Sequence, residues 1–394
     1  MRLICALFVF VASASAIKNY AGYQVLRVVP QDVEQLQGLH KLYNLLEDTV
    51  EFWKEPTKVN RPVDIMVDPN FVQDVKIELS RQGLDFSIFV EDVQTNINND
   101  NERCTDCVNT KVGFDYNRYH TVDEISQWVT DFANENAMVT EISIGNSYEG
   151  RPIKAVKISS GGNKRVIYIQ GGIHGKEWFS PATMIYMSNL LTTNYNTDAK
   201  VKAMVDNYDW YIVPSINVDG YAYTWTDVSI QIYKFSKGVG SNPCSNAYRG
   251  KAALSGTEIS AVDTWIKQFS GNIALFIDFH NYSQRWMYPW SYTADRNTPQ
   301  PDKDAQHALA IKATDALKVP YGTEYFVGMS GPDSAPGPGA SVDYGYGTLG
   351  ANYAYIVELR DQGRYGFLIP ESLIEPSGIE TFEALKVFGT DPLN

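Results

Sequence analysis

The chain has 394 residues, of which 44% are hydrophobic and 20% are charged. This composition is typical of globular proteins, and the length favours two domains, one of them large. The formal net charge of −13 argues against nucleic acid and anionic membrane as partners, because the chain has no basic stripe that could neutralise phosphates.

Residues 1–16, MRLICALFVFVASASA, have the layout of a secretory signal peptide. Arg2 precedes an apolar run from Leu3 to Ala12, and small residues end the segment at Ala16. The run is shorter than the ~20 apolar residues that a membrane anchor needs, and no later segment is long and apolar enough to span a bilayer. The sequence therefore predicts a secreted, extracellular protein without a membrane anchor.

Residues 17–100 are expected to form a small α+β open sandwich. Apolar periodicity predicts strands and helices in the order β-α-β-α-β. These elements cover residues 23–30, 31–46, 63–69, 70–83 and 86–93.

A linker follows at residues 101–113. It lacks hydrophobic periodicity, and its Arg103 and Lys111 are basic residues of the kind that trypsin-like proteases cleave. Cys104 and Cys107 have no second Cys pair nearby, so a local disulfide or two unpaired thiols is favoured over a metal or redox site. Removal of the signal peptide leaves three cysteines, and an odd number is unusual in an oxidising compartment.

Residues 114–394 are expected to form an α/β domain. Near-continuous apolar strands alternate with helices, which indicates a sheet covered by helices on both faces. Strands are predicted at 153–159, 165–171, 209–216, 274–280 and 352–360, and helices at 121–136, 180–193, 258–269 and 302–317. Ligand sites of such sheets lie outside the strand ends.

His174 and Glu177 follow one of these strands, and His280 ends another. Two imidazoles and one carboxylate with an open fourth position are the ligand set of a catalytic zinc. Either histidine alone could equally be a hydrogen-bonded residue at a strand end. The other three histidines, His40, His120 and His307, are expected to be surface or capping residues.

Glu358 ends the apolar strand predicted at 352–360. A charge is costly there unless it is paired or lies in a cleft. It could form an ion pair with Arg360, or it could act as general base toward a water molecule that zinc activates.

Seven motifs, taken together, resemble a pancreatic-type zinc metallocarboxypeptidase. They read YHTVDEI, IGNSYEGRPI, IHGKEW, YIVPSINVDGYAYTW, NPCSNAYRGKAALSGTE, FHNYSQRWMYPW and ELRDQGRYGFLIP. The similarity runs from about Tyr116 to the C-terminus, and the preceding small domain resembles the activation propeptide of that family. The resemblance implies a mixed twisted sheet and a zymogen whose propeptide covers the cleft.

The resemblance also assigns roles to residues. It implies one Zn²⁺ per chain held by His174, Glu177 and His280, with Glu358 as general base, and an exopeptidase that removes C-terminal residues from peptides. Besides the peptide substrates, it implies a second partner, a trypsin-like protease that activates the zymogen. The chain is expected to be a monomer.

The substrate site is expected to contain Lys176, Tyr282 and Val342. Val342 matches the pocket-floor position that sets side-chain preference in the family, and an apolar residue there suits apolar or aromatic C-termini. A valine is also a common core residue, so Val342 by itself is weak evidence for a particular side-chain preference.

The chain departs from the family in the segment after residue 226. The family carries W-R-K and N-R-N-W segments there, whose arginines polarise the scissile carbonyl and clamp the terminal carboxylate of the substrate. Here the interval reads TDVSIQIYKFSKGVGS, with no arginine, and is about 20 residues short of the motif pattern. The family disulfide partner of Cys244 would lie in the missing stretch.

Two further positions differ. Lys176 replaces an arginine of the family, and a small residue near Ala335 replaces a tyrosine that caps the substrate.

Three interpretations remain open at this point. The clamp could be rebuilt from Lys176, Arg249 and Arg285. The chain could be an impaired relative that binds zinc without cleaving peptides. It could also be an incomplete gene model or splice form, which the abrupt junction at Thr226 and the unpaired Cys244 favour. A secreted metal-binding or adhesive protein of another class would not explain Glu358 or the propeptide.

Overall fold

The computed structural model describes residues 20–45, 50–54, 56, 58–95, 113–226, 250–334, 336–390 and 393. The predicted signal peptide, residues 101–112 of the predicted linker and all four cysteines lie outside this set, and so do Arg249 and Ala335. Within the described part of the chain, no helix has the length and apolar character that a membrane crossing requires.

The N-terminal unit is a four-stranded antiparallel sheet with two helices. Its strand order is β2-β3-β1-β4. The elements are β1 (Gln24–Val28), α1 (Val33–Leu45), β2 (Val50–Lys54), β3 (Val63–Val67), α2 (Val72–Arg81) and β4 (Phe86–Val90). The predicted β-α-β-α-β order is therefore correct except that it lacks β2.

Strand β2 escapes the sequence pattern because both of its faces are covered. Phe52 packs into the core that the unit forms with its own helices. The next residue, Trp53, points to the opposite face and packs in a second cluster that contains Leu368 of the larger unit. Adjacent buried residues remove the alternation of apolar and polar positions that identifies a half-buried strand.

The larger unit is built on an eight-stranded mixed sheet of order β11-β10-β12-β9-β7-β8-β6-β5. Strands β8 and β9 are buried along their whole length and β7 is buried in all but its first residue, Arg165, as expected for central strands covered on both faces. The strands are β5 (Val139–Asn146), β6 (Pro152–Ile158), β7 (Arg165–Gly171), β8 (Tyr208–Val213), β9 (Ile273–His280), β10 (Arg285–Tyr288), β11 (Phe326–Met329) and β12 (Tyr353–Glu358).

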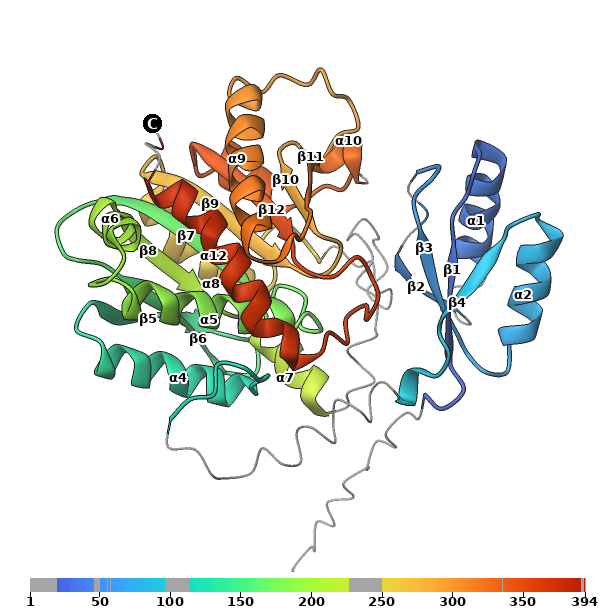
Figure 1. Cartoon of the computed structure of the whole chain (residues 1–394), viewed down its shortest axis with the longest axis horizontal. Helices are drawn as coiled ribbons and strands as arrows, with labels where there is room; N and C mark the ends of the chain where they lie inside the picture. Colours follow the sequence, from blue (N-terminus) through green and yellow to red (C-terminus); the bar gives the residue numbers. More distant parts are fainter. Residues whose placement is uncertain are drawn as a thin grey trace, which may run out of the picture.

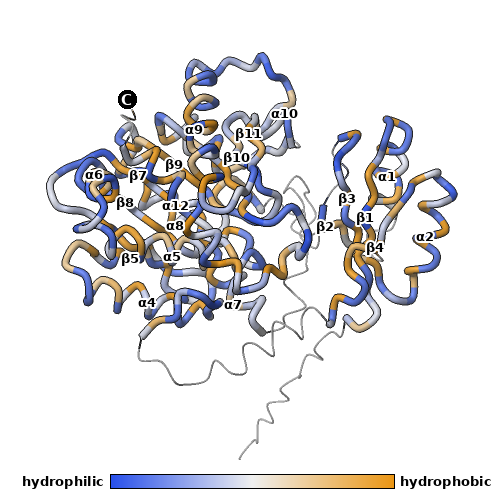
Figure 2. The backbone as a smooth tube through the Cα atoms, in the orientation of Figure 1, coloured by the Kyte–Doolittle hydropathy of each residue, from blue (hydrophilic) through white to orange (hydrophobic). Residues whose placement is uncertain are grey.

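Helices pack on both faces of this sheet (Figure 1). On one face, Tyr355 of β12 donates a hydrogen bond to the Gln306 carbonyl of α9 (Lys303–Tyr321) and lies 5.5 Å from the Phe388 ring of α12 (Ile374–Thr390). On the other face, the Tyr168 ring of β7 lies 6.2 Å from the Trp265 ring of α8 (Thr257–Ile266). Hydrophobic residues, coloured orange in Figure 2, are concentrated in the strands between these layers.

Five described helices of this unit are not predicted by the sequence patterns, namely α6, α7, α10, α11 and α12. The bounds of the described helices of this unit are α4 (Val122–Glu135), α5 (Phe179–Thr193), α6 (Ala199–Asn207), α7 (Val218–Thr226), α8 (Thr257–Ile266), α9 (Lys303–Tyr321), α10 (Ser330–Asp333), α11 (Ser341–Gly347) and α12 (Ile374–Thr390), with 3-10 turns at Lys267–Phe269 and Glu371–Leu373.

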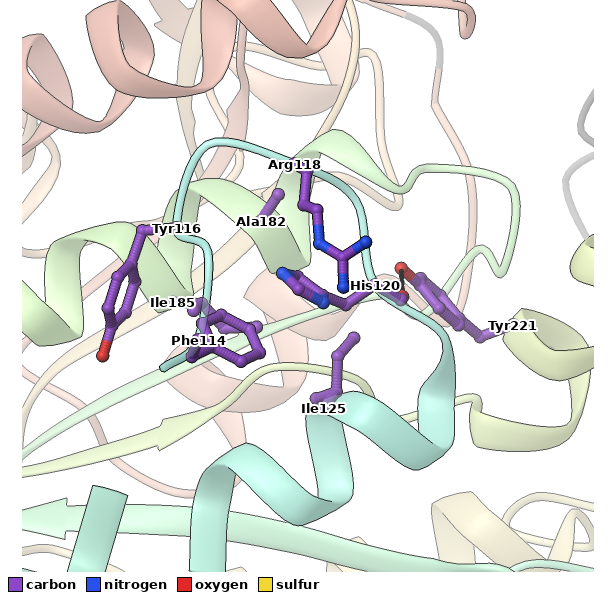
Figure 3. A pocket seen from close by; sticks show the side chains of 8 residues that line it. All are labelled: Phe114, Tyr116, Arg118, His120, Ile125, Ala182, Ile185 and Tyr221. Carbon is purple, nitrogen blue, oxygen red and sulfur yellow. Dashed lines mark hydrogen bonds between the residues drawn. The ribbon is translucent and has the colours of Figure 1, made fainter. Parts of the chain in front are cut away.

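The segment before α4 is held in place by a buried histidine (Figure 3). The His120 side chain is 5% exposed, and its ring stacks on Phe114 with centroids 3.9 Å apart. Its Nε2 lies 2.7 Å from the Asp115 carbonyl, while Tyr221 donates to the His120 carbonyl. The expectation of a surface or capping role is therefore wrong for His120, whereas His40 and His307 are exposed.

Candidate metal centre and substrate site

The loop between β7 and α5 carries the first two expected ligands, His174 and Glu177. Gly172 has a φ of +62°, which favours glycine. A Cβ on Gly175 would lie only 2.3 Å from the backbone of Gly220 in α7. These two glycines let the loop turn back tightly against α7, so that both ligand side chains face the carboxyl end of the sheet.

Hydrogen bonds from the α7 region fix the same loop. Asn217 donates to the Ile173 carbonyl over 3.1 Å, and Thr224 donates to the Gly175 carbonyl over 3.1 Å. The Thr224 hydroxyl also accepts a hydrogen bond from the Trp178 indole. The ligand loop is thus fastened at three points.

His174, Glu177 and His280 come together at the ends of β7 and β9. Their ligand atoms all lie within 4.8 Å of one another. Nδ1 of His174 is 2.8 Å from Oε1 of Glu177, Nδ1 of His280 is 3.0 Å from Oε2, and the two Nδ1 atoms are 3.2 Å apart. Tetrahedral zinc with bonds of ~2.1 Å separates its ligands by about 3.4 Å, so the arrangement fits this ion.

The contacts of the other ring nitrogen of His280, Nε2, support the same geometry. Asp278, which is fully buried, has Oδ2 3.2 Å from Nε2 of His280, and Ser341 of α11 donates to the same carboxylate. A proton on Nε2 leaves the Nδ1 lone pair directed at the cluster, as a metal ligand requires. Asp278 was not predicted from the sequence, although its position two residues before His280, on the same face of the strand, was an available signal.

The electrostatics of Glu177 also suit a cation site. Burial opposes ionisation, but the neighbouring His174 and His280 lower the pKa of Glu177 to about 2. The carboxylate is therefore ionised over the physiological pH range, as a metal ligand must be.

Glu358 ends β12 and lies directly opposite His280 in the parallel pair of β12 and β9. Burial raises the pKa of Glu358 to about 7, although the charges of His280, Arg285 and Lys54 act in the opposite direction. Such a value suits a general base near neutral pH. Arg360 is engaged elsewhere, because it pairs with the buried Glu380 of α12.

Two expected substrate residues, Lys176 and Tyr282, flank the ring of Phe367. The ammonium of Lys176 lies 4.1 Å from the ring centroid, and the Tyr282 ring packs edge-on at 5.1 Å. Lys176 is 6% exposed. Phe367 belongs to one of the seven motifs, but no spacing rule in the sequence marks it as part of this cluster.

Val342 occupies the first turn of α11 and is fully buried. Helix α11 packs on β9 and β12, where Ser341 reaches the Asp278 carboxylate. Val342 is therefore near the metal ligands in the fold, on the helix that covers this face of the sheet.

The N-terminal unit reaches this site with charged and aromatic side chains. Arg27 forms a bidentate ion pair with Asp64 and also donates to the Gly363 carbonyl over 3.3 Å. The Tyr282 hydroxyl lies 3.4 Å from Oδ2 of Asp64, and the ammonium of Lys54 lies 5.3 Å from the Tyr282 ring centroid. The N-terminal unit covers Tyr282 directly.

Comparisons with known proteins agree with this architecture. A family model described as Zinc carboxypeptidase matches residues 125–384, and another described as Carboxypeptidase activation peptide matches residues 26–100. Carboxypeptidase A1 of Homo sapiens is 35% identical over 427 residues, an alignment that covers 100% of this chain and 99% of the human protein. The alignment is longer than the 394 residues of this chain, so the human protein has residues that this chain lacks.

Solved structures show the same fold. The crystal structure of thrombin activatable fibrinolysis inhibitor has a TM-score of 0.83 and 28% identity, covering 93% of this chain and 98% of that chain. Carboxypeptidase A from Helicoverpa armigera has a TM-score of 0.81 and 22% identity, covering 94% and 97% of the two chains.

The mixed sheet and the His-Glu-His cluster at its strand ends agree with a metal-dependent hydrolase that is preceded by a small sandwich domain. The chain belongs to the zinc carboxypeptidase family, whose members are peptide hydrolases, and it carries the activation peptide of a zymogen.

Proposed function

We propose that this chain is a secreted zymogen that, once activated, removes apolar or aromatic residues from the C-termini of peptides. The observation that carries the proposal is the convergence of His174, Glu177 and His280 within 4.8 Å, with Glu358 opposite His280 on the neighbouring strand. The human relative, 35% identical over an alignment that covers 99% of it, is named Carboxypeptidase A1.

His174, Glu177 and His280 would hold the zinc. When bound, zinc supplies a Lewis acid that lowers the pKa of water and polarises a carbonyl oxygen. Glu358 would accept the proton of the attacking water, because burial raises its pKa to about 7, and would then deliver a proton to the leaving amine. Tyr282, Lys176 and Val342 would line the substrate site, and the buried Val342 favours an apolar terminal side chain.

The N-terminal unit would act as the inhibitory propeptide. Its Asp64 and Lys54 approach Tyr282, so peptide could not reach this residue while the unit stays docked. A trypsin-like protease would release it by cleavage at Arg103 or Lys111 in the predicted linker. We further propose that the active form is a monomer, with neither nucleic acid nor membrane as a partner.

The test is to express the full chain with zinc, treat it with trypsin, and follow release of the terminal residue from three peptides. Their C-termini are Phe, Lys and Phe-amide. Release of Phe that depends on trypsin, with slow release of Lys and none from the amide, is expected. Equal release from the amide would indicate endopeptidase activity and contradict the proposal.

A second candidate is a catalytically impaired or truncated relative that binds zinc without turnover. It is favoured by the absence of arginine between Thr226 and Cys244 and by the longer alignment with the human relative. Stoichiometric zinc in the trypsin-treated protein, with no release from any of the three peptides, would support it. Transcript sequence across Thr226–Asp227 would show whether a coding segment is missing.

A further inference from the structure

Arg285 lies in the same row of side chains as the metal ligand His280 and the proposed base Glu358. It begins β10 directly opposite Glu358 in the antiparallel pair of β10 and β12, and Glu358 is opposite His280. Residues that face each other on adjacent strands project from the same side of a sheet. A guanidinium group therefore stands beside Glu358, on the side away from His280.

The guanidinium is only partly used by the protein. Its Nη2 donates to the Asp333 carbonyl, and its Cζ lies 5.0 Å from the Phe326 ring centroid. Its Nε is buried and has no hydrogen-bond partner. Within the described residues no carboxylate forms an ion pair with Arg285, although an arginine fork is the natural receptor for a carboxylate.

The N-terminal unit places two cations, Arg61 and Lys54, within electrostatic range of Arg285. Cζ of Arg61 lies 5.3 Å from the same Phe326 ring. Burial lowers the pKa of Arg285, and the charge of Arg61 adds to this effect. Asp64, an acidic residue of the same unit, is paired with Arg27 through two short hydrogen bonds and not with Arg285. Departure of this unit would remove these like charges from the surroundings of Arg285, which neighbours Glu358 on the adjacent strand.

The other cations considered from the sequence are placed differently. Lys176 is buried with its ammonium over the Phe367 ring, and Arg249 lies outside the described residues. Arg285 is thus the described candidate cation that is a direct cross-strand neighbour of Glu358.

We propose that Arg285 binds a carboxylate group of the peptide substrate after the N-terminal unit has been removed. The inference rests on the proposed peptidase function and adds a receptor for the substrate. Two sources offer the same chemistry: the terminal α-carboxylate of the peptide, and the side chain of a Glu or Asp residue close to its C-terminus.

The experiment compares the wild type with Arg285→Leu and Arg285→Lys in the zinc-loaded, trypsin-activated full chain. Arg296→Leu is the matched control, because Arg296 is an exposed arginine that pairs with Asp333 in the same region but is not opposite Glu358. Peptides ending in Gln-Phe, Glu-Phe and Gln-Phe-amide separate the two carboxylate sources. Equilibrium binding of N-acetyl-phenylalanine and its amide gives a readout that does not depend on turnover.

If the terminal carboxylate is the ligand, R285L raises KM for both free-acid peptides and weakens N-acetyl-phenylalanine binding about 10- to 100-fold. If a side-chain carboxylate is the ligand, R285L removes a preference of the wild type for Glu-Phe over Gln-Phe. R285K, which keeps the charge without the fork, gives an intermediate loss, and R296L behaves as wild type. Because R285K retains the long aliphatic stem and charge, it tests the inference even if R285L does not fold.

Wild-type values for R285L on every peptide and both binding probes would overturn the role of Arg285 and leave the peptidase function intact. If the wild type releases no residue at all, the peptidase proposal fails. In that case the binding measurement still tests Arg285 by itself. Undiminished binding of N-acetyl-phenylalanine to R285L would contradict its role as a carboxylate receptor, and a loss of about 10- to 100-fold would support it.

Discussion

Glu358 and His280 face each other across the parallel strands β12 and β9. Because directly paired residues share one face of the sheet, the proposed base and a proposed metal ligand are held side by side by the backbone pairing of two strands, independently of loop geometry. A substitution of Glu358 therefore tests its proposed role as general base directly.

Glu358→Gln should abolish most peptide hydrolysis while keeping the fold and the zinc. The amide has nearly the same size but cannot accept a proton, and loss of a general base typically reduces kcat by about 10²- to 10⁴-fold. Peptidase assays with parallel zinc analysis check this. Glu383→Gln, at a surface ion pair of α12, is the control. Retention of more than a tenth of the wild-type kcat would argue that another group accepts the proton.

Asp278→Asn should weaken zinc binding, since Asp278 orients the His280 ring through Nε2. Loss of such a partner typically costs about 10- to 100-fold in metal affinity. Competition with a chromophoric chelator measures it without turnover. Ser341→Ala, which removes one hydrogen bond to Asp278, should have a smaller effect in the same direction. Unchanged zinc affinity in D278N would show that His280 is oriented by other contacts.

Asp64→Ala should loosen the N-terminal unit from the catalytic unit. Asp64 is fully buried and its partner Arg27 has a side chain only 22% exposed. Removing one member leaves the other charge partly buried, which costs about 3 kcal/mol in the fully buried case and somewhat less here. We expect a lower melting temperature and some peptidase activity before trypsin treatment.

Glu78→Gln removes an exposed ion pair of the same unit and serves as the control, since surface pairs contribute little. Equal melting temperatures and equal latency for D64A and E78Q would contradict the importance of the Arg27–Asp64 pair.

His120 should make the stability of the protein depend on pH. Burial lowers the pKa of His120 below its usual 6.5, with Asp115, Arg118 and Glu124 as the charged groups around it. The unfolded chain therefore takes up a proton first as pH falls. Stability conferred by the neutral ring is complete above pH 6.5 and is lost below it, by at most about 1.4 kcal/mol per pH unit.

Urea unfolding between pH 7.5 and 5.5 measures this loss, and His120→Gln should flatten the profile. His307→Gln, at an exposed position, should leave the slope of the wild type unchanged. The same slope in H120Q and wild type would assign the pH dependence to other groups.

Much of the fold follows from local pattern. The central strands β7, β8 and β9 are mostly apolar, so their burial was predictable, and His174, Glu177 and His280 lie at or just after recognisable strand ends. Strand β2 was missed because its Phe52 and Trp53 are buried on opposite faces. The strands β10 and β11, at one end of the sheet, were also missed, because each has four residues and so short a segment carries too little periodicity to identify a strand.

The sequence by itself determined the family, the activation peptide and the three proposed donor residues, because short sequence motifs carry them and the residue types and order of such motifs do not depend on the surrounding fold. Only the tertiary structure decided that Asp278 supports His280, that Phe367 joins Lys176 and Tyr282, and that Arg285 neighbours Glu358. The physical reason is that these contacts depend on strand register and on the packing of segments far apart in the sequence, and local residue preferences carry no information about either.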